Sequence, residues 1–413
     1  MTASVAGIDV HKRVLMVVVL TPGQAGAEAG SLPSRRFRTT MAELRHLVAW
    51  LQQLGVQEAV MESTAQYWKP VWLVLEQHFR LFLAQAWSNR APRGKKADFK
   101  DAQRLVRRHL AGELTLSFVP DGEQRLARTL TRRRTQLTRD RVRIQNQVES
   151  LLEETQVKLS SLVSDLFGAS GVRILKAISE GVTDPVKLAQ LGDARLQHTP
   201  EELAEALTGN VSPWHRQLLK QHLEQVQLVD KQLQELSELT AAALKSHADA
   251  IQRLVQVPGI RVVAAQQIVA EAGPQASAFA TADRFCSWLG VCPGSQESAG
   301  ENHSSRCAKG NVYLRRVLCL AAQAAVRTQN RSFQQRFRRL LPRLGYTKAI
   351  WATAHRLAIV IWKILHTGVA YKEYGCETTP QARKRRLQRI QRELRALGYS
   401  DQLKPLAPQA QPE

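Results

Sequence analysis

The sequence contains no apolar run that is long enough to cross a membrane. Its longest early run, residues 14–20, is far shorter than the ~20 residues that a membrane-spanning helix needs. Two basic residues precede this run, as in a signal peptide. However, Asp9 upstream and the polar residues 21–23 downstream favour a strand followed by a turn. We therefore expect a protein that does not bind or cross a membrane.

The chain has few cysteines and no Cys-x-x-Cys motif. All five cysteines lie between residues 286 and 376, so we expect a reducing cytosol rather than a framework of disulfides. Three of them could be considered as zinc ligands together with His303, but their spacing fits no compact zinc knuckle. The sequence also lacks a Gly-x-x-x-x-Gly-Lys-Ser/Thr loop, so we do not expect the protein to use ATP.

Acidic residues are absent from residues 302–372, which hold fourteen Lys and Arg side chains. Residues 90–143 are also basic, with sixteen basic and six acidic side chains, whereas residues 144–260 are net acidic. The whole chain has a formal net charge of +22. Because an ordinary solvated surface mixes both signs, the two basic segments indicate a polyanionic partner, most simply nucleic acid. The alternative is a merely soluble basic protein.

The first 110 residues predict an α/β domain. Apolar runs and helical periods predict strands at 5–10, 14–20, 35–40, 58–61 and 81–84 and helices at 41–54, 68–78 and 98–110. This order, β-β-β-α-β-α-β-α, matches a ribonuclease-H-like fold. In that fold the first and fourth strands are neighbours, and the last helix packs beside them.

Four acidic residues occupy positions that this fold would bring together. Asp9 lies within the first strand, and Glu62 ends the fourth. Asp98 and Asp101 lie three positions apart at the start of the last helix, so they share one face. Like charges ~4 Å apart repel by ~4 kcal/mol at an effective dielectric of 20. Such a cluster is stable when protonated or metal-bound, and oxygen ligands suit Mg²⁺ or Mn²⁺. Taken singly, Asp98 could cap its helix and Glu62 could be a surface residue.

The middle of the chain predicts two long helices. Residues 122–162 contain no Pro or Gly after the first residue, and apolar residues recur there every seven positions. These are Leu130, Leu137, Ile144 and Leu151. A second helix is expected at about 215–244, after a helical insert that Gly and Pro interrupt. The pattern allows an antiparallel pair within one chain or a coiled coil between chains.

Residues 291–311 predict a long polar loop with four serines. Ser298 precedes Ala299 and Gly300, whose small size allows close approach of a phosphate. Basic residues that could hold this phosphate follow: Arg306, Lys309, Arg315 and Arg316. A serine needs activation to attack phosphorus, and spacing identifies no His/Asp partner, although His303 is near. The alternative is an ordinary loop serine.

A short turn upstream of this loop, Val257-Pro258-Gly259-Ile260, resembles the turn of a helix-hairpin-helix element. In such an element, backbone N–H groups at a helix start face a DNA phosphate. Arg261 replaces the usual second glycine. The alternative is a plain packing turn between two helices.

Five groups of residues, in order along the chain, resemble the insertion-sequence-110 family, the DEDD transposases described as bridge-RNA-guided recombinases. They are Gly7-Ile8-Asp9-Val10-His11-Lys12; Met61-Glu62-Ser63-Thr64 with Tyr67-Trp68; Asp98-Phe99-Lys100-Asp101-Ala102; Val257-Pro258-Gly259-Ile260; and Gly290-Val291-Cys292-Pro293-Gly294, Glu297-Ser298-Ala299-Gly300 and Lys309-Gly310-Asn311 with Leu314-Arg315. Together they span residues 5 to about 330. Each group alone is a weak signal, but five groups in the same order are specific for the family. Ala65, where the family often has Gly, and Arg261 depart from the family pattern.

With the patterns above, the resemblance implies four regions. They are a RuvC-like domain at 1–118, a helical coiled-coil region at 119–250, a mostly helical transposase domain at 251–375 and a basic tail at 376–413. It implies a catalytic metal site for Mg²⁺ or Mn²⁺ at Asp9, Glu62, Asp98 and Asp101. It also implies that Ser298 is a nucleophile that forms a phosphoserine link to DNA.

The implied partners are donor DNA, target DNA, a structured bridge RNA and further copies of the chain in a dimer or tetramer. In the family, the acidic cluster of one subunit meets the serine of another. The implied location is the bacterial cytoplasm, in association with the nucleoid.

Two other functions remain as alternatives. A RuvC-like, Mg²⁺-dependent junction nuclease would use the four carboxylates with water and would need no serine. A non-catalytic nucleic-acid-binding protein would need only the basic segments, and the four carboxylates argue against it. Trapping of a covalent protein–DNA adduct would separate the nuclease from the recombinase.

Overall fold

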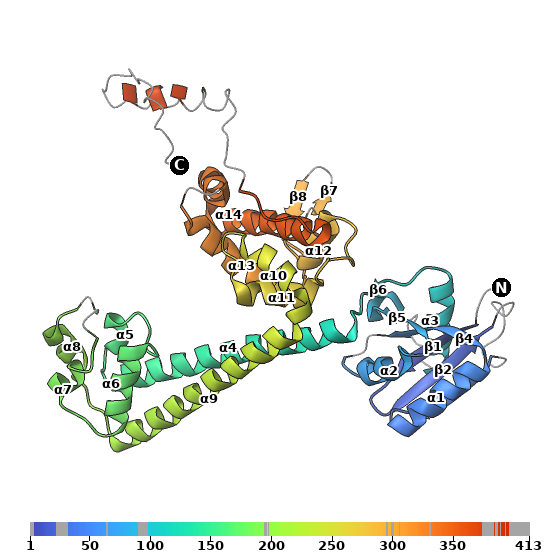
Figure 1. Ribbon diagram of the computed structural model, residues 1–413, viewed down its shortest axis with the longest axis horizontal. Helices are drawn as coiled ribbons and strands as arrows, with labels where there is room; N and C mark the ends of the chain where they lie inside the picture. The colour runs from blue at the N-terminus through green and yellow to red at the C-terminus, as the bar shows by residue number, and fades with distance from the viewer. Residues whose placement is uncertain are drawn as a thin grey trace. The chain divides into compact units, whose positions relative to one another are not determined.

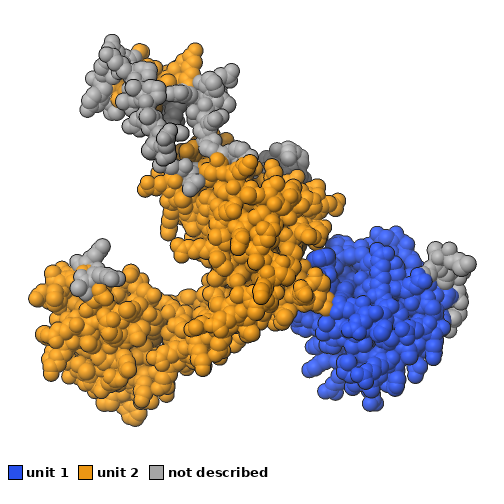
Figure 2. Space-filling view, viewed as in Figure 1, with its two compact units in different colours: residues 1–120 blue, residues 121–413 orange. Residues whose placement is uncertain are grey.

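The protein is described from a computed structural model. The described residues are 4–21, 32–62, 65–89, 98–193, 196, 198–294, 296–298, 301–304, 306–329, 332–373 and eight residues between 384 and 395. The chain divides into two compact units, unit 1 (residues 1–120) and unit 2 (residues 121–413) (Figure 1, Figure 2). Unit 1 is mixed α/β and unit 2 is mostly helical, which confirms the predicted class of an α/β domain followed by helices.

Unit 1 is built on a six-stranded mixed sheet in the order β3-β2-β1-β4-β5-β6. Its strands are β1 (Ser4–Val10), β2 (Val14–Leu20), β3 (Ser34–Arg38), β4 (Val56–Glu62), β5 (Arg80–Ala84) and β6 (Leu116–Ser117). β1 pairs antiparallel with β2 and parallel with β4, so that Ile8 lies opposite Met61. The first and fourth strands are therefore neighbours, as predicted. β6 is missing from the prediction, because two residues are too few to show a period.

Helices pack on both faces of this sheet. They are α1 (Met41–Gln53), α2 (Trp68–Leu75) and α3 (Asp98–Leu110), with a 3₁₀ turn η1 (Ala86–Asn89) before α3. α1 and α2 share a core with Ile8 and Met61 on one face. On the other face, Ala102 and Val106 of α3 pack against Val5.

Gly7 allows α3 to lie directly on β1. Ile8 points into the core beneath α1 and α2, so the two-residue period of the strand turns Gly7 and Asp9 to the face that α3 covers. A Cβ at Gly7 would lie 2.3 Å from the carbonyl oxygen of Ala102. Any side chain there would push α3 away, so this glycine sets how closely the first turn of α3 approaches Asp9.

Two long helices of unit 2, α4 (Gly122–Glu154) and α9 (Pro213–Ala243), lie side by side (Figure 1). Arg141 Nε donates to Asp230 Oδ1 at 2.7 Å. Nearer the start of α4, Arg134 Nη1 donates to the carbonyl of Leu233, later in α9, at 3.1 Å. The order of these contacts shows that the two helices are antiparallel.

The heptad seam of α4 packs within one chain. Leu137 and Ile144 are 3% and 6% exposed, in a core cluster with residues of α9, whereas Leu130 and Leu151 are half-buried. Of the two arrangements that the sequence allowed, the structure therefore has the antiparallel pair within the chain. The two central residues of the seam, Leu137 and Ile144, are covered by α9 of the same chain.

α4 ends eight residues before the helix predicted at 122–162. Gln156 adopts a left-handed φ of +63°, and the N–H of Val157 donates to the carbonyl of Leu152 at 2.9 Å, which closes the helix. A cluster of four short helices follows and packs against α4 and α9. They are α5 (Leu159–Leu162), α6 (Ala169–Ser179), α7 (Pro185–Ala189) and α8 (Pro200–Ala206).

The remaining helices of unit 2 share a second core. After the 3₁₀ turn η2 (Lys245–His247), they are α10 (Ala248–Val255), α11 (Val262–Ala272), α12 (Ala282–Leu289), α13 (Val312–Arg327) and α14 (Ser332–Thr367). α14 is broken at Gly345, whose φ of +73° and ψ of 169° are not helical. An antiparallel hairpin of β7 (Gln296–Ser298) and β8 (Glu301–Ser304) lies between α12 and α13. Within the described part of the chain, no helix is long and apolar enough to cross a membrane.

Candidate active site and nucleic-acid surface

Three of the four predicted carboxylates converge in unit 1. Asp9 in β1 and Glu62 at the end of β4 lie on the face that α3 covers, because the residue before each of them points into the opposite core. Asp101 lies in the first turn of α3, which packs against this face. The side chain of the fourth carboxylate, Asp98, lies outside the described part of the structure.

The surroundings of Asp9 favour its protonated form. Burial raises the pKa of the Asp9 carboxyl, and the negative charges of Glu62 and Asp101 raise it further. His11 opposes this rise, with its Nε2 at 3.1 Å from Asp9 Oδ2. The net shift of the pKa is upward, because burial, the largest cause, acts in the same direction as the two neighbouring carboxylates.

Glu62 and Asp101 are connected through Asn89, which the sequence analysis did not single out. Asn89 Nδ2 donates to Glu62 Oε2 at 3.0 Å. Arg104 donates to the carbonyl of Asn89 from Nε at 3.2 Å and to Asp101 Oδ1 from Nη2 at 2.6 Å. Asn89 is buried, and its Oδ1 has no hydrogen-bond partner among the described residues. No local pattern marks Asn89, because its partners lie 27 and 15 positions away.

The donor chemistry of this cluster suits a hard divalent cation. Such ions take carboxylate and amide oxygens as ligands, and these carboxylates repel one another unless a proton or a cation intervenes. As they stand, no three acidic, His or Cys side chains in the described ranges are grouped closely enough to hold a metal ion. Asp101 is instead paired with Arg104.

Ser298 is the last residue of β7 and lies opposite Glu301, the first residue of β8. The predicted polar loop is therefore partly a β-hairpin. Its strands carry polar residues throughout, so they lack the alternation by which a strand is recognised in a sequence. The side chains of Ser298 and of the other loop serines, Ser295, Ser304 and Ser305, lie outside the described residues.

Glycines close the base of this hairpin. A Cβ at Gly294 would lie 2.4 Å from the carbonyl oxygen of Arg306, and a Cβ at Gly310 would lie 2.3 Å from the backbone nitrogen of Gly290. The segments before and after the hairpin are thus packed backbone against backbone, which a side chain at either glycine would prevent.

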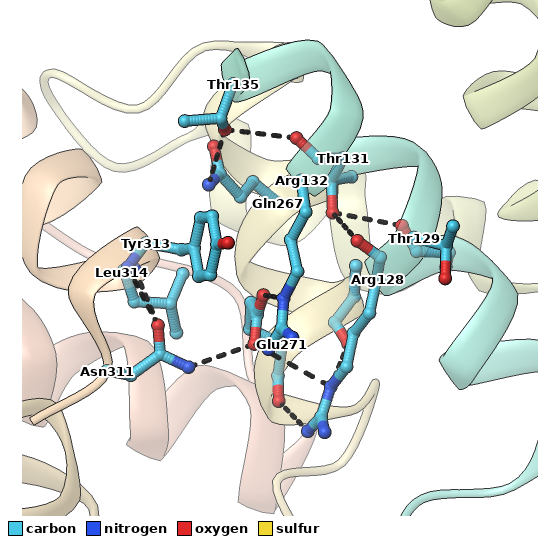
Figure 3. Close-up of polar contacts among 12 residues, drawn as sticks. Arg128, Thr129, Thr131, Arg132, Thr135, Gln267, Glu271, Asn311, Tyr313 and Leu314 are labelled. Carbon is cyan, nitrogen blue, oxygen red and sulfur yellow. Dashed lines mark hydrogen bonds and ion pairs between the residues drawn. The ribbon is translucent and has the colours of Figure 1, made fainter. Parts of the chain in front are cut away.

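A buried acid, Glu271 of α11, lies close to this base. Glu271 is 0% exposed and is bound by Arg132 of α4 and by Asn311 at the start of α13 (Figure 3). Arg128 adds a second cation, with its Nε at 3.7 Å from Glu271 Oε2. No motif points to this residue; its one signal in the sequence is that Glu271 is the one charged residue in the helix VVAAQQIVAEA.

The turn at 257–260 lines a groove of about 1150 Å³ in unit 2. Gly259 has a φ of +84°, and a Cβ there would lie 2.2 Å from the carbonyl oxygen of Ala321 in α13, so the turn also packs two helices together. The basic residues that line the groove are Arg134, Arg261, Arg316 and Arg327. Half-exposed apolar residues, among them Val263 and Leu320, complete the lining. Arginines beside apolar surface suit the phosphates and bases of a nucleic acid.

The four basic residues predicted to hold a phosphate have different places. Arg316 lines the groove. Arg315 instead lies 4.5 Å from the centre of the Trp351 ring and donates to the carbonyl of Ala308. Arg306 and Lys309 are exposed after the hairpin. Of the four, Arg316 alone lines this groove, and Arg315 packs on Trp351 beside the exposed Lys309.

A sheet of this topology, with carboxylates from β1, β4 and α3 on one face, is that of a ribonuclease-H-like domain of the DEDD type. Residues 6–157 match the DEDD transposase family of IS110, described as "Transposase", and residues 251–338 match the "Transposase IS116/IS110/IS902 family". The two matches together cover more than half of the chain. The protein belongs to the IS110 family of transposases, and it is a DNA-cleaving enzyme of a class whose DEDD domain suggests divalent metal use.

Two relatives support this assignment. A Pseudomonas aeruginosa (strain PAO1) protein named "Probable family 20 transposase" is 25% identical over 380 residues, which are 90% of this chain and 99% of that protein. The y4pF/y4sB protein of Sinorhizobium fredii (strain NGR234), whose name also describes it as a transposase, is 23% identical over 288 residues, which are 68% of this chain and 65% of that protein. The first similarity extends over nearly the whole length of both proteins.

Proposed function

We propose that this transposase cuts and joins DNA strands through a phosphoserine intermediate on Ser298, aided by a metal site at Asp9, Glu62, Asp98 and Asp101. The observation that carries the proposal is the convergence of carboxylates from β1, β4 and α3 on one face of the sheet. Mutual repulsion makes such a cluster costly for folding alone, so it is a candidate for catalysis. The match of residues 297–300 to the serine position of the family supports Ser298.

The serine reaction conserves the energy of the phosphodiester bond. Ser298 gives its hydroxyl proton to a base, its oxygen forms a bond to phosphorus, and the bond from phosphorus to one deoxyribose oxygen breaks. That oxygen takes up a proton and leaves as a hydroxyl group. In the reverse reaction, the hydroxyl of a second DNA strand attacks the phosphoserine, which joins the strands and releases Ser298.

The four carboxylates would hold Mg²⁺ or Mn²⁺, which prefer oxygen ligands. When bound, such an ion polarises the scissile phosphate and stabilises negative charge on the leaving oxygen. The chain itself orients the ligands: Asn89 holds Glu62, and Arg104 holds Asp101. Because Arg104 also binds the backbone of Asn89, the two carboxylates keep a fixed relation to each other.

DNA and a structured bridge RNA would bind to the basic surface of unit 2. The groove beside the 257–260 turn supplies four arginines, and Arg306 and Lys309 are exposed after the hairpin. Neutralising phosphates in this way releases counterions, so the affinity should fall steeply with salt. A flat salt response would assign these residues to solvated surface.

A composite site, with carboxylates from one subunit and Ser298 from another, would require a dimer or tetramer. Since α9 covers Leu137 and Ile144, the contact between chains must use other residues. The same proposal includes association with the bacterial nucleoid. It also includes a division of the chain into four regions, at 1–118, 119–250, 251–375 and 376–413. Most of the basic tail, 376–413, lies outside the described residues.

Trapping of the intermediate tests the proposal. A nicked duplex from the ends of the element that encodes the chain, supplied with RNA from the same element, should give a denaturant-stable protein–DNA adduct that maps to Ser298. Ser298→Ala should abolish the adduct while nucleic-acid binding persists and stability changes by under ~0.5 kcal/mol. An adduct on Ser295 or Ser305 would refute the assignment. Cleavage without any adduct would favour the water-using junction nuclease.

A further inference from the structure

Glu271 of α11 has an unusually complete set of partners for a buried acid. Arg132 binds both of its oxygens, with Nε at 2.6 Å from Oε1 and Nη2 at 2.8 Å from Oε2. Asn311 Nδ2 donates to Oε2 at 2.9 Å, and Arg128 donates to the backbone carbonyls of Ala270 and Glu271 (Figure 3). The acid thus connects α4, α11 and the start of α13 through one side chain.

Asn311 uses both ends of its amide group. Its Oδ1 caps α13 by accepting from the backbone N–H groups of Tyr313 and Leu314, each at 3.0 Å. Its Nδ2 donates to Glu271, and its own N–H donates to the carbonyl of Trp288 in α12 at 3.0 Å. A helix cap needs only the acceptor, so the bond to Glu271 is an additional constraint on this residue.

Asn311 also occupies the point at which the serine hairpin returns to the helical core. It follows Gly310, whose backbone packs on Gly290, and the hairpin with Ser298 lies between these two glycines. One end of the segment continues from α12 through Gly290, whereas the other end is tied to Glu271 through Asn311. The hydrogen bond between Asn311 and Glu271 therefore fixes the returning end of the hairpin against α11 and α4.

We propose that Glu271 is a positioning residue for the serine reaction, acting through Asn311 to hold the hairpin of Ser298 in register with the helical core. The inference rests on the proposed function, since it assumes that Ser298 is the nucleophile. Glu271 touches neither DNA nor Ser298 in this scheme. Its carboxylate receives the amide of Asn311, and Arg132 keeps that carboxylate in place by binding both oxygens.

A pure stability role would not require this arrangement. A buried ion pair contributes little net stability compared with apolar packing, and Arg128 already binds α11 through backbone carbonyls. What the carboxylate adds is a directional acceptor for Asn311. Small displacements of reacting groups lower rates strongly, by up to about a hundredfold for ~1 Å, so a directional contact at the hairpin base has a measurable consequence.

An exchange of donor and acceptor tests the proposal. Asn311→Asp keeps the cap of α13 but loses the donor and places a second carboxylate against Glu271. Adduct formation from the nicked duplex and RNA described above should slow about tenfold to a hundredfold at saturating DNA, with an unchanged Kd for DNA. The double variant Glu271→Gln with Asn311→Asp restores a donor–acceptor pair and the net charge, so it should recover most of the wild-type rate.

A matched control is available at another helix start in unit 2. Asp184 caps α7 by accepting from the backbone N–H groups of Val186 and Lys187. Asp184→Asn makes the reverse exchange of carboxylate and amide at a cap far along the sequence from the hairpin, and it should leave the adduct rate unchanged. Thermal unfolding of each variant shows whether the fold is retained.

The outcomes separate this proposal from the proposed function. If wild type forms an adduct on Ser298 and Asn311→Asp forms it equally fast, the positioning role is wrong and the phosphoserine reaction stands. A slow single variant that the double variant fails to rescue would also overturn the role, because the defect would then belong to Asn311 alone. No adduct in wild type overturns both.

Discussion

Each of the two units contains a carboxylate site, and the surroundings of the two sites differ: the carboxylates of unit 1 are half-buried, whereas Glu271 of unit 2 is fully buried. In unit 1, burial raises the pKa of Asp9, and two neighbouring carboxylates raise it further against the opposing effect of His11. In unit 2, Glu271 lies between two arginines, and its hydrogen bond to Arg132 raises the pKa of that guanidinium. The first site gathers three carboxylates, and the second holds a single carboxylate between two cations of the same chain.

This difference indicates that the Asp9 site, rather than the Glu271 site, is suited to bind a cation from outside the chain. A carboxylate with its own arginines is complete, and its contribution is to hold elements together. A carboxylate that faces other carboxylates is stable only with a proton or a cation, which makes it a candidate for metal binding and catalysis. Removing a carboxylate should therefore have opposite effects on the stability of the two units.

The largest expected effect on the free energy of unfolding is that of Glu271→Ala. This substitution leaves the guanidinium groups of Arg128 and Arg132 without their carboxylate. Breaking a buried ion pair in this way lowers the unfolding free energy by about 3–5 kcal/mol. Because the Arg132 side chain is 38% exposed, we expect a value near the lower end of this range. Chemical denaturation should show this loss of unfolding free energy. As a control, Glu235→Ala removes an exposed pair with Lys231 and should cost under about 1 kcal/mol. Equal effects of the two variants would contradict the comparison.

The second expected effect is stabilisation by a divalent ion. Mg²⁺ at about 100 times its Kd should add ~2.7 kcal/mol to the unfolding free energy, because it binds the folded state alone. Asp9→Asn should remove this response, whereas Glu43→Gln, in the same unit at the start of α1, should keep it. Thermal unfolding with Mg²⁺ and with a chelator measures the effect. A response retained in Asp9→Asn would place the ion elsewhere.

A third variant tests how close packing creates the acidic cluster. Gly7→Ala places a Cβ 2.3 Å from the carbonyl oxygen of Ala102, so α3 must move away from β1, at a cost of about 1–3 kcal/mol. DNA cleavage should fall with it, because Asp101 moves with α3. Gly122→Ala is the control, since its Cβ would make only an ordinary contact, 3.7 Å from Arg125. Cleavage at the wild-type rate in Gly7→Ala would show that this packing is dispensable.

The smallest expected effect is the pH dependence of stability. A carboxyl whose pKa is raised on folding, as for Asp9 above its usual 3.8, binds its proton more tightly in the folded state. Its contribution to stability is therefore present below the pKa of the unfolded chain and is lost as the pH rises through the folded pKa. With a chelator present, Asp9→Asn should be more stable than wild type at neutral pH, and this advantage should shrink in acid. An advantage that grows in acid would contradict the raised pKa.

Much of unit 1 could be predicted from local pattern. β2 has the sequence VLMVVVL and is buried along nearly all its length, as a continuous apolar run predicts. The match to a known fold predicted that the first and fourth strands are neighbours, which brings Asp9 and Glu62 close together. Asn89 and Arg104 could not be predicted, because their contacts join residues that no local period relates.

In unit 2 the residue pattern was enough to predict the two long helices and the polar segment at 291–311, but it left their packing partners open. An apolar seam can be covered by a helix of the same chain or of another, since apolar burial has no direction. That α9 covers Leu137 and Ile144 is seen in the folded chain alone. The tertiary structure also decided the role of Glu271, whose partners Arg132 and Asn311 lie 139 and 40 positions away. A buried charge shows in the sequence as an exception within an apolar helix, but the chain must fold before its compensating charges are known.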